Sequence, residues 1–302
     1  MPNTTGTMFF NPSSGAKIAD KELEELKLAA AASGLEVIQL TREVNVAQTI
    51  RDRIARGIKL FVAAGGDGTI THVIQPLVET DAILGVIPVG TYNHFAKDMK
   101  IPLEWREALD ALVSGQTRQV DVARVNERYF VNNLSIGLYP EMVAKREARG
   151  RDYSRFRARL YAAYHTIRKY PHVTLAIDTE HHHEVIRTHV FMVSNNSYDL
   201  SRIGVEAPRE SLEGGRVSVY WLPHLPRIAL MRFVARYLAG RVTATPGFRS
   251  FRTTQLRVQS RRPSIRAGID GELMNLATPL TISIVPQSLN VRVPADPPDS
   301  SS

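Results

Sequence analysis

The order of apolar and polar positions divides the chain into two parts with different periodicity. Up to about residue 115, short apolar runs alternate with segments of helical spacing. The apolar runs predict strands at 7–10, 35–40, 59–64 and 83–87, and the periodic segments predict helices at 20–33, 46–56 and 70–79. Strands separated by helices of this length are typical of βαβ units, so we expect an α/β domain with a parallel sheet.

After Gln119 the pattern changes to a series of strands with few helical segments between them. The predicted strands are 120–125, 129–134, 173–177, 185–193, 217–221, 250–258, 264–267 and 280–285. The third and fourth are expected to form a hairpin across residues 178–184. This spacing is typical of a mostly antiparallel domain. We therefore predict domains at 1–119 and 120–293, followed by a disordered tail at 294–302 that is rich in Pro, Asp and Ser.

The amino-acid composition indicates a globular protein and excludes several kinds of site. With 302 residues, 43% of them apolar and 23% charged, the chain has enough apolar material for a packed globular core. It contains no cysteine, which excludes disulfides, thiolate metal sites and a cysteine nucleophile. No apolar run approaches the roughly 20 residues of a membrane-spanning helix. We expect a soluble, cytoplasmic protein, or one that lies peripherally at the inner membrane.

The positive charge is concentrated in one segment. The chain has a formal charge of +8, and residues 145–170 contain nine Lys and Arg against two Asp and Glu, a local charge of +7. The second half of this segment has helical spacing, so we predict an amphipathic basic helix within an insertion near 141–170. Two interpretations stay open: a solvated helix packed on the protein body, or a surface for anionic lipid or phosphate. Nucleic acid is disfavoured, because no recognition pattern accompanies the charge.

The strongest chemical signal is a buried strand that leads into a glycine-rich turn, Gly65-Gly66-Asp67-Gly68-Thr69. Glycines let backbone N–H groups approach an anion, and the start of the following helix favours negative charge. Asp67 would repel a phosphate unless it bound Mg²⁺ or accepted a proton, so the turn indicates phosphoryl transfer. The alternative is a tight turn in which Thr69 is the helix N-cap. Neither the P-loop pattern nor the dinucleotide-binding pattern is present.

Four motifs together resemble the diacylglycerol kinase catalytic family, which includes bacterial lipid kinases and the sphingosine and ceramide kinases. They are Asn11-Pro12-Ser13-Ser14-Gly15, the turn at 65–69, Pro88-Val89-Gly90-Thr91-Tyr92-Asn93-His94-Phe95-Ala96, and Asp270-Gly271-Glu272. The similarity extends over nearly the whole chain. The turn alone is shared with NAD kinases and phosphofructokinases, so the specificity comes from all four motifs in order.

The resemblance implies a two-domain lipid kinase that uses ATP and Mg²⁺ and acts at a membrane surface in phospholipid metabolism. Its α/β domain would be Rossmann-like, similar to those of NAD kinase and phosphofructokinase, its second domain a β-sandwich, and its active site would lie in the cleft between them. The implied ATP-binding residues are Asn11, Ser13, Ser14, Gly15, Thr41, Gly65, Gly66, Asp67, Gly68, Thr69, Ile70, Thr71, Gly90 and Thr91. Thr41 follows a predicted strand, where ligands of parallel sheets bind, but it would serve equally well as a helix N-cap.

The resemblance also implies catalytic roles. Glu272 matches the family's general base, Asp67 would bind Mg²⁺ through the nucleotide, and Asp121 matches another acidic position that supports the cleft or the metal. Without the other motifs, residues 270–272 would be interpreted as a plain β-turn.

Two departures from the family pattern leave other functions open. His94 stands where many members have Asp, and Gly214 stands where a carboxylate ligand of a structural Mg²⁺ is expected, so we expect that second metal site to be altered or absent. The alternatives are a nucleotide-binding regulator with weak catalysis and a small-molecule kinase of NAD-kinase type. The triplet 181–183 of histidines is interpreted as a solvated hairpin turn, and Trp105 and Trp221 as packing residues. The acceptor lipid and the oligomeric state, a homodimer included, are left open.

Overall fold

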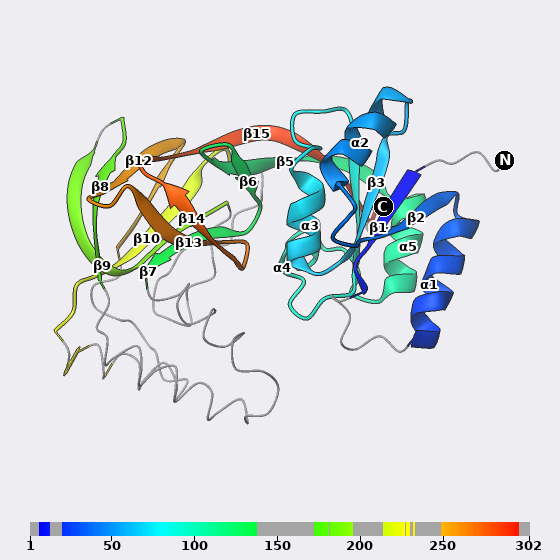
Figure 1. Cartoon of the computed structure of the whole chain (residues 1–302), viewed down its shortest axis with the longest axis horizontal. Helices are drawn as coiled ribbons and strands as arrows, with labels where there is room; N and C mark the ends of the chain where they lie inside the picture. Colours follow the sequence, from blue (N-terminus) through cyan, green and yellow to red (C-terminus); the bar gives the residue numbers. More distant parts are fainter. Residues whose placement is uncertain are drawn as a thin grey trace, which may run out of the picture. The chain divides into compact units, whose positions relative to one another are not determined.

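The computed structural model describes residues 6–12, 20–137, 172–180, 182–195, 214–226, 228–229, 232 and 249–295, and the statements below concern these residues. The chain forms two compact units, one of residues 1–122 and 285–302 and the other of residues 123–284. Two long strands, β5 (Gln116–Val125) and β15 (Leu280–Val293), carry the chain from one unit to the other (Figure 1).

The first unit is built on a parallel sheet. Its strands are β1 (Gly6–Phe10), β2 (Leu35–Gln39), β3 (Leu60–Gly65) and β4 (Ile83–Pro88). They lie in the order β4-β3-β1-β2, and all three neighbouring pairs are parallel. The second part of β15 extends the sheet next to β4, in parallel, with Asn290 opposite Ile83. The predicted α/β domain with a parallel sheet is therefore confirmed.

Helices cover both faces of this sheet (Figure 1). They are α1 (Asp20–Ala32), α2 (Val46–Ala55), α3 (Asp67–Ile74), α4 (His94–Asp98) and α5 (Trp105–Ser114). Side chains of α1 and α5, Trp105 among them, pack against alternate residues of β1 and β3 in one apolar cluster. Because β3 is covered on both sides, it is a continuous apolar run rather than an alternating one.

The structure corrects two expectations about the first unit. The helix predicted at 70–79 starts at Asp67 and ends at Ile74, so most of the glycine-rich turn is the first helical turn. Its N-cap is Gly66, not Thr69. The helices α4 and α5 were not predicted; α4 is a five-residue helix, too short for its periodicity to show in the sequence.

The second unit is an antiparallel β-sandwich. Its strands include β6 (Arg128–Phe130), β7 (Asn133–Gly137), β8 (Val173–Asp178), β9 (His183–Ser194) and β10 (Val217–Pro223). They continue with β11 (Arg249–Thr253), β12 (Gln255–Ser260), β13 (Ser264–Ile269) and β14 (Glu272–Ala277). As predicted, β8 and β9 form a hairpin, with Asp178 opposite His183.

The buried positions of this unit explain which of its strands could be predicted from the sequence pattern. Alternate residues of β8, β9, β10 and β12, with Trp221 among them, meet in one apolar cluster. Trp105 and Trp221 are 7% and 5% exposed, which confirms their predicted packing role. The predicted strands 129–134 and 250–258 each prove to be two strands. Strand β14 was missed because Leu276 is the one buried residue of this strand.

The linear division of the sequence placed residues 285–293 with the second domain, whereas the structure groups them with the first unit, where Asn290 and Val291 pair with β4. Their partner is about 200 positions away, so local periodicity carries no trace of it. The predicted basic helix at 145–170 and the predicted disordered tail lie almost entirely outside the described residues, and so do Ser13, Ser14 and Gly15.

Candidate functional site

The candidate site lies at the carboxyl ends of three neighbouring parallel strands. Asn11 directly follows β1, Gly65 ends β3, and Pro88 ends β4. Because these strands are adjacent and parallel, their carboxyl ends meet at one edge of the sheet, where open α/β sheets bind ligands. Three of the sequence motifs, far apart in the chain, are thereby brought to one place.

The junction between β3 and α3 is tightly packed. A Cβ atom on Gly65 would collide with the side chain of Thr69, one helical turn further on, so glycine is required there. No side chain of the described residues caps the N-terminus of α3, because its N-cap is Gly66. The first-turn N–H groups of this helix, from Asp67 onwards, are therefore the natural donors for an anionic ligand at this edge.

The loops after β3 and β4 touch through their backbones. A Cβ atom on Gly90 would fall well inside contact distance of the Cα atom of Gly66 and 2.8 Å from Oδ1 of Asn93. The glycine at 90 is thus explained in part by close approach of two chain segments and not by ligand contact alone, whereas a Cβ atom on Gly66 would make only an ordinary contact with Gly90 at 3.4 Å.

Asn93 holds the second loop in shape, a role that sequence reasoning missed. It is 7% exposed and has a left-handed backbone with φ of 51°. Its Oδ1 accepts a hydrogen bond from the N–H of Gly90 at 3.1 Å, and its Nδ2 donates to the carbonyl of Gly90 at 3.0 Å. The signal was present in the quoted motif, since Asn adopts left-handed backbone more readily than most residues.

Asp67 and Asn11 link the three strand ends. Oδ1 of Asp67 accepts a hydrogen bond from the N–H of Phe95 at 3.2 Å, which connects the β3 and β4 loops. Nδ2 of Asn11 donates to Oγ1 of Thr69 at 3.0 Å, which connects β1 to the first turn of α3. Residues 11, 67, 69 and 90 of the predicted nucleotide site therefore form one connected group.

The other predicted nucleotide ligands fall around this group. Thr91 is exposed in the β4 loop. Ile70 is fully buried, and its N–H donates to the carbonyl of Gly66 within the helix, while Thr71 is 8% exposed. Thr41 is exposed, two residues beyond β2, and its Oγ1 accepts from the N–H of Glu43 at 3.3 Å. Its alternative role as a helix N-cap is wrong, because Asn45 caps α2.

The remaining acidic candidates come from other elements of the chain. Asp121, on β5, is 3% exposed, and its Oδ1 accepts from the N–H of Gln287 at 2.9 Å. Glu272 belongs to the second unit, at the exposed start of β14. The residues before it form a tight turn, as the alternative interpretation of residues 270–272 has it: Asp270 and Gly271 have φ of 46° and 91°, as a two-residue type I′ hairpin requires.

Asp270 has a structural function that the sequence did not reveal. Its carboxylate accepts hydrogen bonds from three consecutive N–H groups, those of Val131, Asn132 and Asn133, at 3.0, 2.8 and 3.0 Å. It is 7% exposed. It therefore ties the β13–β14 turn to the connection between β6 and β7, and leaves Glu272 as the exposed carboxylate of the motif.

The residues at the strand ends suit Mg²⁺ that arrives with a nucleotide better than a metal held by protein alone. Within the described ranges, no three His, Asp or Glu side chains are grouped so that they could hold a metal ion. Mg²⁺ is commonly held by one or two carboxylates together with substrate phosphates. The half-buried carboxylate of Asp67, beside the uncapped start of α3, fits that pattern.

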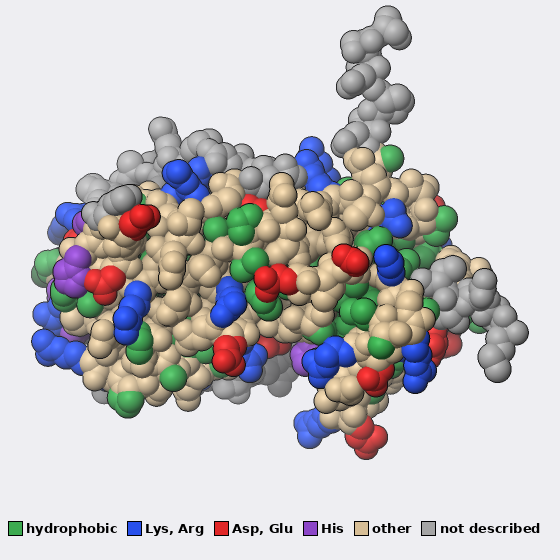
Figure 2. Space-filling view, turned by 90° about the horizontal axis from the view of Figure 1, so that it is seen from above, with side chains coloured by type: hydrophobic (Ala, Val, Ile, Leu, Met, Phe, Trp, Pro, Cys, Tyr) green, Lys and Arg blue, Asp and Glu red, His purple; other side chains and the backbone are tan. Residues whose placement is uncertain are grey.

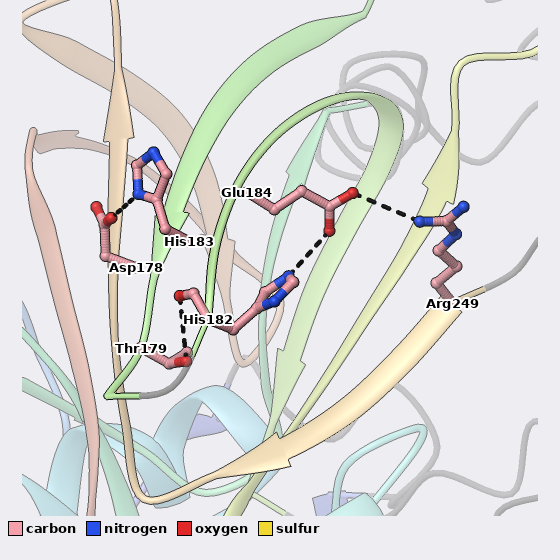
Figure 3. Close-up of polar contacts among 6 residues, drawn as sticks. All are labelled: Asp178, Thr179, His182, His183, Glu184 and Arg249. Atoms are coloured by element: carbon pink, nitrogen blue, oxygen red, sulfur yellow. Dashed lines mark hydrogen bonds and ion pairs between the residues drawn. The ribbon is translucent and has the colours of Figure 1, made fainter.

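The departures from the family pattern have distinct surroundings. The His94 ring stacks on Tyr92 with 5.7 Å between ring centroids and an interplanar angle of 4°. Gly214 is exposed, three residues before β10. In the histidine triplet, His183 contacts Asp178 and His182 contacts Glu184, at a hairpin tip as predicted (Figure 3).

Known proteins share this architecture. A solved structure of a diacylglycerol kinase from Bacillus anthracis str. Sterne aligns with a TM-score of 0.68 and 17% identity over 96% of this chain and 97% of that one. Another structure from the same organism aligns with a TM-score of 0.73 and 20% identity over the same shares. At these identities the likeness establishes the fold: a parallel α/β unit joined to an antiparallel β-sandwich.

Sequence comparison adds the family. Residues 5–125 match the diacylglycerol kinase catalytic domain, and residues 141–293 match the YegS C-terminal NAD kinase beta sandwich-like domain. The chain therefore belongs to the diacylglycerol kinase family. Curated relatives named diacylglycerol kinase include one from Bacillus subtilis, 35% identical over 140 residues, and one from Staphylococcus saprophyticus, 32% identical over 129 residues. The first alignment covers 45% of this chain and 46% of the relative, the second 41% and 42%, so each spans less than half of the relative's length.

Proposed function

We propose that the protein is a kinase that transfers the γ-phosphate of ATP to a lipid hydroxyl in a Mg²⁺-dependent reaction. Membership of the diacylglycerol kinase family supports this class of reaction, and the names of the relatives favour a diacylglycerol-like acceptor. The observation that carries the proposal is the connected group at the strand ends, where Asn11, Asp67 and Gly90 surround the uncapped start of α3.

In this proposal the strand-end group binds the phosphates of the nucleotide. The first-turn N–H groups of α3 donate to phosphate oxygens, and the Gly66–Gly90 contact keeps both loops free of side chains that would block the anion. Residues 13–15, Thr41 and Thr91 complete the proposed nucleotide site. When bound, Mg²⁺ supplies charge neutralisation for the transferring phosphoryl group, and Asp67 is the carboxylate that would hold it, with Asp121 in a supporting role.

Glu272 is proposed as the general base. A lipid hydroxyl is a weak nucleophile, so a carboxylate must accept its proton as the bond to phosphorus forms. Glu272 is exposed at the start of a strand, and the turn that places it is anchored by Asp270. Its carboxylate is therefore accessible to a substrate while its backbone is rigidly held.

A second candidate function is a nucleotide-binding regulator with little turnover. The replacement of a family carboxylate by His94, whose ring is stacked on Tyr92, favours it, because a catalytic loop then carries an imidazole instead of an acid. A small-molecule kinase of NAD-kinase type is the third candidate.

No helix within the described residues combines the length and apolarity needed to cross a lipid bilayer. The proposal places the lipid acceptor at a membrane surface and includes anionic lipid contact through residues 145–170.

Transfer of labelled γ-phosphate from ATP with Mg²⁺ to a panel of extracted lipids tests the proposal. A labelled lipid that is absent without Mg²⁺ supports a lipid kinase and identifies the acceptor class. Binding of ATP without any labelled lipid would favour the regulator, and labelling of a soluble acceptor such as NAD would favour the third candidate.

A further inference from the structure

The second unit has a hollow of about 650 Å³ between the tip of the β8–β9 hairpin and β11. Its apolar part is formed by Trp221 of β10 and Phe251 of β11, whose rings meet edge to face with 5.8 Å between centroids. Trp221 belongs to the apolar core of the sandwich, and Phe251 is half-buried against it. The aromatic part of the hollow is thus rigid and continuous with the core.

The remaining lining is polar and rich in arginine. Arg216, Arg249 and Arg252 contribute three guanidinium groups, against the two carboxylates of Glu180 and Glu184. Figure 2 shows Lys, Arg and His side chains gathered at the end of this unit that carries β8 and β9, at the left of the view. His182 and the hydroxyl side chains of the hairpin tip, of β11 and of the β11–β12 connection complete the lining. The lining therefore has a net positive charge at neutral pH.

The carboxylate of Glu184 is engaged with neighbouring side chains. Glu184 accepts from Nη1 of Arg249 at 3.4 Å through one oxygen and contacts Nε2 of His182 at 3.2 Å through the other (Figure 3). Both contacts are between partly exposed side chains, and such ion pairs contribute little to stability, so they open at small cost. An incoming anion could thus take the guanidinium of Arg249 from Glu184.

We propose that this hollow binds a phosphate ester whose organic part is planar or apolar. Arginine guanidinium groups match phosphate oxygens in paired hydrogen bonds, and the aromatic rings provide a surface for the organic part. A volume of about 650 Å³ is within the range of small-molecule sites. All of its lining residues belong to the second unit, so the inference is independent of the strand-end site proposed for ATP.

Trp221 gives a local signal for the test. The chain has two tryptophans. Within the described part of the chain the buried Nε1 of Trp105 has no hydrogen-bond partner, so Trp105→Phe removes no hydrogen bond made there and leaves Trp221 as the only indole. In this background phenyl phosphate is titrated while tryptophan fluorescence is recorded. Inorganic phosphate tests the anionic part of the ligand alone, and benzyl alcohol tests the aromatic part alone. Phosphatidylcholine vesicles with or without phosphatidate test whether the phosphate ester that binds is a lipid headgroup.

We expect a saturable change with phenyl phosphate and a weaker one with either half alone. Arg249→Gln and Arg216→Gln should each weaken binding by about tenfold, whereas Arg261→Gln, an exposed arginine outside the hollow, should leave it unchanged. A response to phosphatidate vesicles with the same arginine dependence assigns the site to a lipid headgroup, and a response to phenyl phosphate alone assigns it to a soluble ester. No response to either probe, or a response that both hollow variants retain while their thermal transitions stay normal, overturns the inference.

Discussion

The carboxylate of Asp67 accepts a hydrogen bond from the backbone N–H of Phe95, with 3.2 Å between Oδ1 and N. This bond joins the loops that follow β3 and β4, which are 28 positions apart in the chain. Asp67 therefore has a structural function as well as the chemical function proposed for it, and experiments must separate the two.

Replacement of Asp67 by Asn separates them. The amide oxygen can still accept from Phe95, so the unfolding midpoint should stay near that of the wild type, whereas phosphoryl transfer should fall by at least about a hundredfold because an amide is a poor Mg²⁺ ligand. Thermal unfolding and the labelled-phosphate assay measure the two effects. Asp81→Asn, at an exposed position of the same unit, is the control. Wild-type turnover in Asp67→Asn would show that the loop has another function.

Replacement of Glu272 by Gln tests the general base. The side chain is exposed, so the change should leave stability unaltered, and loss of the base should lower the turnover rate by about a hundredfold or more with little change in the KM for ATP. Steady-state kinetics of phosphoryl transfer provide the measurement, with Glu127→Gln, exposed in the same unit, as the control. An equal loss in both variants would contradict a specific role.

Replacement of Gly90 by Ala tests the contact between the two loops. The added Cβ would overlap the Cα of Gly66, and backbone cannot move aside as a side chain can, so we expect a loss of about 1–3 kcal/mol in unfolding free energy. The reciprocal change, Gly66→Ala, places its Cβ 3.4 Å from Gly90, an ordinary contact, and should cost much less. Denaturant unfolding compares the two. Equal losses would mean that the close approach is not what requires glycine.

Replacement of Asp270 by Ala should destabilise the second unit. Three N–H groups, of which those of Val131 and Asn132 are buried, would lose their acceptor, at a cost of about 2–4 kcal/mol. Asp270→Asn keeps one oxygen for the N–H groups of Asn132 and Asn133 and should cost less. Denaturant unfolding of both variants tests the order. If the two variants were equally stable, the carboxylate would not be the anchor of this turn.

The stability of the protein should fall at mildly acidic pH because of His224. Burial, the nearby Arg187 and the neighbouring His189 and His172 lower the pKa of His224 below its ordinary 6.5. Its ring lies 5.0 Å from that of His189 and 5.2 Å from that of His172, between centroids. The unfolded chain then binds more protons than the folded one, so the stabilisation is fully present above pH 6.5 and is lost as pH falls through the lower folded-state pKa.

Denaturant unfolding at about pH 7.5 and about pH 5.5, on either side of the ordinary histidine pKa, measures this effect. The loss of stability between the two should be smaller in His224→Gln than in the wild type. His94→Gln, which lies in the other unit, should retain the full loss. An unchanged pH dependence in His224→Gln would assign the effect to other groups.

Particular residues show what the chain encodes locally. Backbone propensity and side-chain periodicity act over a few positions of the chain. They are enough to specify three features: the apolar strand β3 that ends at Gly65, the helices α1 and α2, and the type I′ turn at the Asp-Gly pair. The parallel α/β unit, the antiparallel unit and the family membership were therefore predictable, and so was the region of the candidate site.

Long-range contacts were decided by tertiary structure alone. Three such contacts join residues that are from 24 to about 200 positions apart. They are the packing of Gly66 on Gly90, the hydrogen bonds from the 131–133 backbone to Asp270, and the pairing of β15 with β4. The hollow at Trp221 and Arg249 likewise depends on strands that are paired by register and not by sequence proximity. Such contacts follow from how complete elements pair and pack, which no local pattern of side chains specifies.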